Sequence, residues 1–188
     1  MANGALTVKV AKTLKEKFRE RGLDVLHDHG QKGGDLDNTP GKLRSWFGSD
    51  STRETALADL DLAVVSRDPN EAKKAKAYAL VEIEETPPQP KVILGDIFAT
   101  LLGDGITFQG KRLCVGSWTT FIVLARNEHD SHQRRMTYLE QQANQLKTHL
   151  SSKSNASIGR IILDSFKETE LEEKLRWHIE ESLSKAGV

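Results

Sequence analysis

The sequence has a single cysteine, Cys114, among its 188 residues. One cysteine cannot form a disulfide within the chain, and no cluster of cysteine and histidine suggests a structural zinc site. No apolar run approaches the ~20 residues that a membrane helix needs. The start of the chain has no basic segment followed by an apolar one, so we expect no signal peptide. These absences favour a protein of a reducing, cytoplasmic compartment that is not attached to a membrane.

The chain also lacks a net charge, since its 27 basic residues match its 27 acidic ones. A neutral chain is not expected to bind nucleic acid through bulk charge alone. The charges are unevenly distributed, however. Residues 59–110 hold nine acidic and five basic residues, whereas residues 111–167 hold nine basic and four acidic ones. An acidic segment followed by a basic one suits a metal site beside a surface that contacts phosphate.

The sequence does contain enough apolar residues for a substantial core. Hydrophobic residues make up 37% of the chain and charged residues 29%, which is typical of a soluble globular protein of one domain. We therefore expect one domain over residues 1–188, with a core over residues 6–125 and a C-terminal helix–strand–helix over residues 130–186.

Apolar periodicity predicts a mixed α/β sandwich. Helical spacing indicates helices at residues 6–21, 91–102, 130–150 and 171–183, and a short helix-favouring run at residues 71–77. Apolar segments indicate strands at residues 23–29, 59–66, 78–85, 119–125 and 158–163, with a hairpin at residues 106–108 and 112–115.

Pairs of carboxylates stand inside two of the expected strands, within residues 59–96. Side chains alternate faces along a strand, so Asp59 and Asp61 would share one face, and Glu82 and Glu84 one face of the next. Like charges side by side in apolar, central strands repel and are costly to desolvate. A hard cation such as Mg²⁺ removes that penalty. The pattern predicts a metal site, and the alternative is charges at solvated strand ends.

The element order, with acidic residues on the second and third strands and a helix next, resembles the core of the restriction-endonuclease-like superfamily. The signature of that superfamily is PD-(D/E)xK. Asp61 would supply the Asp, and Glu82-Ile83-Glu84 would stand at (D/E)xK, with Glu in the Lys position. The resemblance covers residues 6–125 and implies an α/β three-layer sandwich, with a mixed central sheet flanked by helices.

The resemblance implies a DNA endonuclease that hydrolyses phosphodiester bonds with Mg²⁺ or Mn²⁺. Asp61, Glu82 and the carbonyl of Ile83 would hold the metal, and Glu84 would bind a second metal or orient the attacking water. Lys91, in the first turn of the next expected helix, is the candidate for the missing lysine. Cleavage of both DNA strands would need two active sites, which suits a homodimer.

Residues 30–58 are the least regular part of the sequence, with several glycines in a polar stretch. A loop this long is usually functional or disordered. Four of its residues suit phosphate contact and stacking on bases or sugars: Lys42, Arg44, Trp46 and Arg53. The alternative is that Trp46 only fixes the loop to the core.

Three other functions stay open on the sequence alone. The first is a binding module on the same fold without catalysis, which the missing lysine and the neutral charge support. The second is a hydrolase or nucleotidyltransferase acting on small phosphate compounds, although no Gly-rich loop with Lys-Ser/Thr occurs. The third is a histidine site at His27 and His29, or at His129 and His132, for which no further ligands are evident. No Gly-x-Ser-x-Gly occurs, so serine hydrolysis is unsupported.

Overall fold

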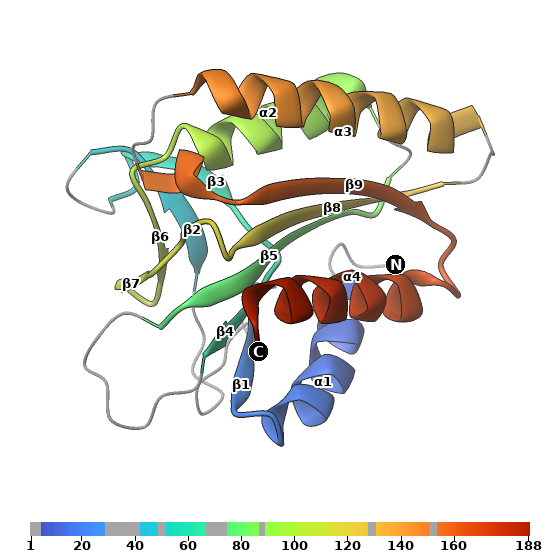
Figure 1. The fold of residues 1–188 in the computed structure, drawn as a ribbon, viewed down its shortest axis with the longest axis horizontal. Helices are drawn as coiled ribbons and strands as arrows, with labels where there is room; N and C mark the ends of the chain where they lie inside the picture. The colour runs from blue at the N-terminus through green and yellow to red at the C-terminus, as the bar shows by residue number, and fades with distance from the viewer. Residues whose placement is uncertain are drawn as a thin grey trace.

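A five-stranded sheet forms the middle of three layers in the computed structural model of the protein (Figure 1). Helices α1 (Ala5–Arg19) and α4 (Leu171–Ala186) cover one face of this sheet, and α2 (Pro90–Leu101) and α3 (Ser131–His149) cover the other. The structure describes residues 5–28, 42–48, 52–66, 75–86, 89–127, 131–150 and 154–188. The predicted mixed α/β sandwich is confirmed at this level.

The central sheet has the order β1-β4-β5-β8-β9, so its strands follow one another in space as they do along the chain. The strands are β1 (Leu23–His27), β4 (Leu62–Ser66), β5 (Ala77–Glu84), β8 (Thr120–Arg126) and β9 (Arg160–Phe166). The pairs β1–β4 and β4–β5 are antiparallel, whereas β5–β8 and β8–β9 are parallel. Parallel neighbours need a crossover connection, and α2 and α3 lie in the two connections concerned.

A second, smaller antiparallel sheet has the order β3-β2-β6-β7. Its strands are β2 (Leu43–Trp46), β3 (Ala56–Asp59), β6 (Gly105–Phe108) and β7 (Lys111–Leu113). One face of this small sheet joins the core of the central sheet, through Leu43, Ile106, Phe108 and Leu113. Figure 1 shows it at the end of the central sheet where β8 and β9 begin.

Two apolar layers hold the sheet between its helices. Successive residues of β5 serve opposite layers: Leu80 packs towards α2 and α3, and Val81 packs towards α1 and α4. The first six residues of β8 are all buried. Burial on both faces explains why these strands appear in the sequence as continuous apolar runs.

The predicted strand over residues 59–66 is wrong, because the chain forms two strands there. Strand β3 ends at Asp59 in the small sheet, and β4 begins at Leu62 in the central sheet. Asp59 and Asp61 therefore do not share a face of one strand. The helix-favouring run at residues 71–77 ends in a strand, because Ala77 is the first residue of β5. Residues 71–74 lie outside the described residues.

The irregular segment at residues 30–58 contains β2 and the first three residues of β3, which the sequence pattern did not predict as strands. Strand β2 pairs with β6, about sixty positions further along the chain, as in the pair Arg44 and Thr107. A strand with a distant partner has no local hairpin signal. Within the described ranges, no helix has both the length and the apolar character needed to cross a bilayer.

Candidate functional site

Asp61 is held in the break between β3 and β4. Its N–H donates to the carbonyl of Val81 at 3.1 Å, and its own carbonyl accepts the N–H of Asp28 at 2.9 Å. Its carboxylate oxygen Oδ2 accepts the N–H of Ile83 at 2.7 Å. Only 8% of Asp61 is exposed, so these bonds fix a buried carboxylate against β5.

Glu82 and Glu84 alternate with Ile83 along β5, as predicted, and share the face of Leu80 towards α2 and α3. Burial raises the pKa of Glu82 well above its usual range, and the carboxylates of Asp61, Asp96 and Glu84 raise it further. The oxygen Oε2 of Glu82 is buried and has no hydrogen-bond partner among the described residues. A buried acceptor without a donor is costly.

Asp96 of α2 is a fourth carboxylate of this site, and it was not predicted from the sequence. Burial raises the pKa of Asp96 to about 6, and the charges of Glu84 and Asp61 contribute to this shift. One signal was available. Asp96 and Lys91 are the only charged residues in α2, whose other residues are mostly apolar. A carboxylate in such a helix, beside a strand with two glutamates, is a candidate ligand.

The four carboxylates Asp61, Glu82, Glu84 and Asp96 are called the carboxylate site below. Every charge that shifts the pKa of Glu82 or Asp96 is another carboxylate of the site. Like charges gathered away from water are relieved by a proton or by a bound cation. Carboxylate oxygens are the ligands that Mg²⁺ takes up in proteins.

The carboxylate oxygens of the site are suitable ligands for a hard cation, but they do not surround a single position that an ion could occupy. Within the described residues, no three His, Cys, Asp or Glu side chains lie in an arrangement that could hold a metal ion. The carboxylate of Glu84 is turned to Thr86, whose N–H donates to it at 3.0 Å and whose hydroxyl also donates to it. Closure around a cation therefore requires Glu84 to leave Thr86.

Lys91 is not brought to the carboxylate site. It is exposed in the first turn of α2 and precedes Asp96 by five residues. At 3.6 residues per turn, five residues correspond to roughly 140° around the helix axis. Lys91 thus lies on the solvent side of a helix whose other side carries Asp96.

Lys42 and Arg44 lie beside the site, paired with acidic residues. The Nζ of Lys42 lies 3.2 Å from Asp28 and 3.1 Å from Asp59, and the Nε of Arg44 donates to Asp59 at 2.7 Å. Asp59 is therefore a partner of basic residues and not of Asp61. Because Asp28 donates its N–H to Asp61, this ion-pair network adjoins the carboxylate site.

Trp46 is buried, with 3% of its surface exposed. The guanidinium of Arg112 lies 5.1 Å from the centre of its ring, and Gly105 lies against the ring on β6. This ring is not open to a base, and it fixes β2 within the small sheet, which was the alternative. Arg53 is exposed in the turn before β3, and Phe47 is 61% exposed.

The two histidine pairs fall largely outside the described residues. His29 and His129 are not described, and of His132 only the helical backbone is. His27 ends β1 and is buried. The histidine site therefore stays an untested alternative.

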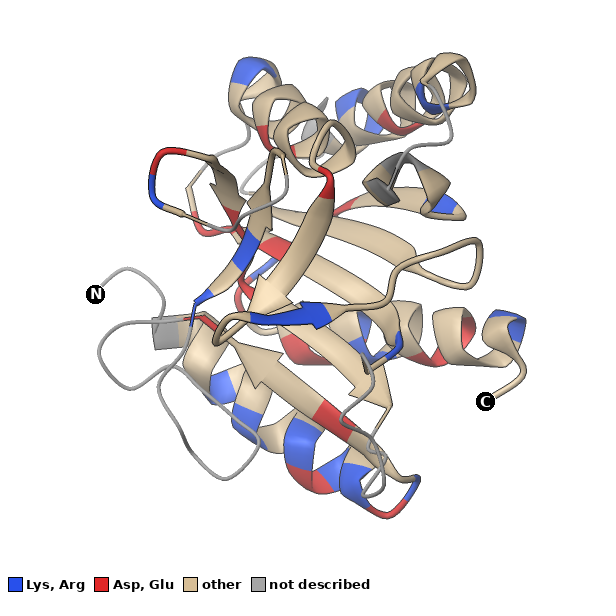
Figure 2. Ribbon diagram, turned by 90° about the vertical axis from the view of Figure 1, so that its left-hand side faces the viewer, with Lys and Arg blue, Asp and Glu red and all other residues tan. Residues whose placement is uncertain are grey.

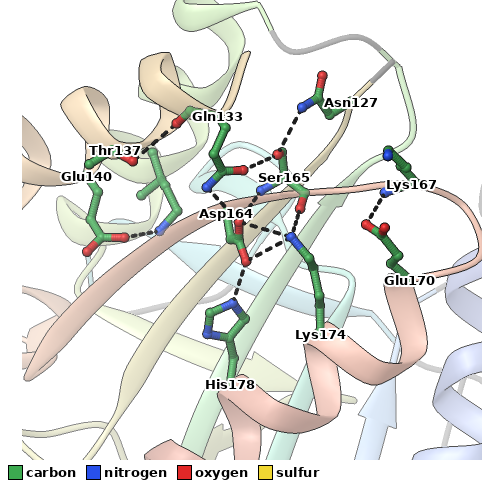
Figure 3. Close-up of polar contacts among 11 residues, drawn as sticks. Asn127, Gln133, Thr137, Glu140, Asp164, Ser165, Lys167, Glu170, Lys174 and His178 are labelled. Atoms are coloured by element: carbon green, nitrogen blue, oxygen red, sulfur yellow. Dashed lines mark hydrogen bonds and ion pairs between the residues drawn. The ribbon is translucent and has the colours of Figure 1, made fainter. Parts of the chain in front are cut away.

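A second polar cluster, also missed from the sequence, surrounds Asp164 on β9 (Figure 3). Its carboxylate accepts hydrogen bonds from His178 at 3.0 Å and Gln133 at 3.0 Å, and Lys174 lies 3.5 Å away. Burial acts to raise the pKa of Asp164, but the bonds from His178 and Gln133 and the charge of Lys174 outweigh it and lower this pKa to about 2. The cluster joins β9 to α3 and α4 and gives the Asp164 carboxylate several donors, whereas the buried Nδ1 of His178 has no hydrogen-bond partner among the described residues.

Comparison with known proteins gives no match to this chain among family models, curated proteins or solved structures. The resemblance to the restriction-endonuclease-like superfamily therefore depends on the residues and topology described above.

The pKa of Asp96 leads to a prediction for the metal-free protein. This pKa is about 6 in the folded protein and 3.8 ordinarily, so the folded state holds the proton more tightly than the unfolded state does. Stability from this group is therefore fully present below about pH 4 and lost as the pH rises to about 6. In EDTA at pH 7, Asp96→Asn should raise the melting temperature by a few degrees, and at pH 4 it should have little effect.

Asp59→Asn is the matched control for that measurement, because the pKa of Asp59 is lowered by Arg44 and Lys42 despite partial burial. Its replacement should not raise the melting temperature at pH 7. A lower melting temperature for Asp96→Asn at pH 7 would contradict the electrostatic description of the site.

Proposed function

We propose that this protein is a metal-dependent nuclease that hydrolyses phosphodiester bonds, with DNA as substrate. The observation that supports this most strongly is a buried carboxylate oxygen of Glu82 that has no partner among the described residues, in a side chain whose pKa the charges of Asp61, Asp96 and Glu84 help to raise. Such a group is poorly stable by itself and suited to a divalent cation.

The topology supports assignment to the restriction-endonuclease-like fold. Three strands run antiparallel, and a connection that contains α2 and the β6–β7 hairpin then leads to a parallel fourth strand. Asp61 immediately precedes the second of these strands, Glu82 and Glu84 lie on the third, and the helix that follows carries Asp96. This is the arrangement that the resemblance implies for Asp and (D/E)xK.

The backbone of Ile83 supports its proposed role as a ligand. Its N–H points to Asp61, and the N–H and C=O of one strand residue point to the same side. The pairing of β4 with β5 ends at Val81, so the carbonyl of Ile83 faces Asp61 beyond the last paired residue. Asp61, Glu82 and this carbonyl would hold a Mg²⁺ or Mn²⁺ ion.

A bound divalent cation supplies a Lewis acid for the phosphate and lowers the pKa of a nearby water. The roles of the side chains follow from their positions. Asp61 accepts the N–H of Ile83 and would provide a fixed donor to the ion, whereas Glu84, now bonded to Thr86, would orient the attacking water or hold a second ion once freed from Thr86. Asp96, whose pKa is raised in part by the charge of Glu84, would complete the set of donors.

Cleavage assays test this proposal directly. Supercoiled plasmid and single-stranded DNA are incubated with purified protein in EDTA, in Mg²⁺ and in Mn²⁺. We expect cleavage only with a divalent cation. Intact DNA under all conditions would favour the second candidate, a non-catalytic binding module on the same fold, for which the position of Lys91 away from the site is the supporting observation.

Glu84→Lys tests the variant motif. We expect the loss of a carboxylate at this position to reduce cleavage by ~10²-fold or more, the range for a positioned acid or base. Lys91→Ala is the companion variant and should change the rate by less than about threefold, because Lys91 is exposed away from Asp96. Initial rates of plasmid nicking measure both. Full activity of Glu84→Lys would show that Glu84 has no catalytic role.

A further inference from the structure

The small sheet has one face on the core and an opposite, outer face that carries basic residues. Directly paired residues of neighbouring strands point to the same side. The pairs Asp59–Arg44, Arg44–Thr107 and Thr107–Arg112 therefore place four side chains in one row across β3, β2, β6 and β7. This side of the sheet is called the outer face below.

The guanidinium of Arg112 is held in place on the outer face. It stacks over the ring of Trp46 at 5.1 Å and donates to the carbonyl of Asp104. Arg112 is nevertheless exposed, as is Lys111 beside it at the turn of the hairpin. In the part of the chain that the structure describes, neither makes an ion pair with a carboxylate. A fixed, exposed guanidinium without an acidic partner is suited to phosphate.

Further positive charge borders this row. Lys42, 60% exposed in its side chain, precedes β2, and Lys76 is exposed where the chain pairs with the residue after β7. Figure 2 looks onto this side of the molecule and shows basic residues on the strands of the small sheet. Arg44 and Arg112 are two strands apart, about 10 Å at the usual spacing.

We propose that the outer face of the small sheet binds the sugar–phosphate backbone of duplex DNA. This inference rests on the proposed function and adds contacts from Arg112 and Lys111 to those expected from Lys42 and Arg44. The network of Lys42, Asp28 and Asp59 connects the outer face to Asp61. DNA lying across the face is thus directed towards the carboxylate site, although the chain has no net charge.

The test measures DNA binding without cleavage. Fluorescence anisotropy of a labelled duplex is recorded in EDTA over a range of salt concentrations, for wild type and for the double variant Lys111→Gln, Arg112→Gln. Each lost phosphate contact should lower the slope of log K against log salt by about one. The double variant should therefore lose about two units of slope, and its affinity at 0.1 M salt should fall by roughly 50-fold.

Two further variants separate this surface from general charge and from misfolding. Lys9→Gln, Lys12→Gln removes the same charge from exposed positions of α1, on the other face of the central sheet, and should bind almost as wild type does. Arg112→Lys keeps the charge and should keep most of the salt slope. Thermal melts identify any variant that fails to fold.

Equal losses of duplex affinity in the α1 variant (Lys9→Gln, Lys12→Gln) and the β7 variant (Lys111→Gln, Arg112→Gln) would overturn the proposal. Unchanged duplex affinity of the β7 variant would also overturn it, as would tighter binding of wild type to single-stranded DNA than to the duplex. Plasmid cleavage in Mg²⁺ distinguishes failure of this inference from failure of the nuclease. If wild type cleaves DNA but the β7 variant binds duplex unchanged, only the proposed role of the outer face is refuted. If the β7 variant loses duplex binding but wild type does not cleave DNA, only the proposed nuclease activity is refuted.

Discussion

Asp61→Asn and Glu82→Gln are each expected to reduce Mg²⁺-dependent DNA cleavage by about 10³-fold or more. A metal that polarises the phosphate lowers the activation free energy by several kcal/mol. Each 1.36 kcal/mol lost from this stabilisation slows the reaction tenfold. Both changes preserve side-chain shape, and the amide oxygen that replaces the Asp61 carboxylate can still accept the N–H of Ile83. The variants should therefore fold and bind DNA while losing cleavage.

Asp24→Asn is the matched control, because Asp24 is also buried but lies on β1 outside the carboxylate site. It should cleave at nearly the wild-type rate. Initial rates, melting temperatures and duplex affinity in EDTA are compared for all three variants. If Asp61→Asn or Glu82→Gln retained more than a tenth of wild-type activity, the carboxylate site would not be the catalytic centre.

Asp164→Ala is expected to lower the free energy of unfolding by about 2–3 kcal/mol, because the change removes a partly buried carboxylate that accepts hydrogen bonds from several side chains. The change leaves His178, Lys174 and Gln133 without their shared acceptor between β9, α3 and α4. Urea denaturation at pH 7 measures the loss. A loss below about 1 kcal/mol, the range for an exposed ion pair, would contradict a structural role for the cluster.

The pH dependence of stability provides a second reading of the same cluster. The pKa of Asp164 is lowered from 3.8 to about 2, so its stabilisation is present above about pH 4 and lost as the pH falls through about 2. The difference between wild type and Asp164→Ala should therefore shrink towards about pH 2. Asp59→Ala is the control at a more exposed ion pair and should cost less than about 1 kcal/mol at pH 7.

Local periodicity was enough to predict the helices and most strands of the central sheet. The apolar stripe of α4 matches the side of the helix that is buried against the sheet, and the apolar run of β8 matches a strand buried on both faces. The alternation of Glu82 and Glu84 about Ile83 was predicted for the same reason. These features are encoded within a few residues of sequence.

Features that depend on distant partners could not be predicted. Strand β2 is specified by its pairing with β6, and the position of Asp96 against Glu84 depends on how α2 packs on the sheet. The donors to the Asp164 carboxylate come from two helices, with Gln133 on α3 and His178 on α4. Asp61 was predicted as a site residue, but its position between β3 of the small sheet and β4 of the central sheet could not be predicted.

The most direct test of the central claim is calorimetric titration of Mg²⁺ and Mn²⁺ into the metal-free protein at pH 7, without DNA. We expect saturable binding to wild type, accompanied by a rise in melting temperature because the ion binds only the folded state. Binding should disappear in the double variant Asp61→Asn, Glu82→Gln and weaken in Asp96→Asn. Absence of saturable binding to wild type, or equal binding to the double variant, would contradict a metal centre at these four carboxylates.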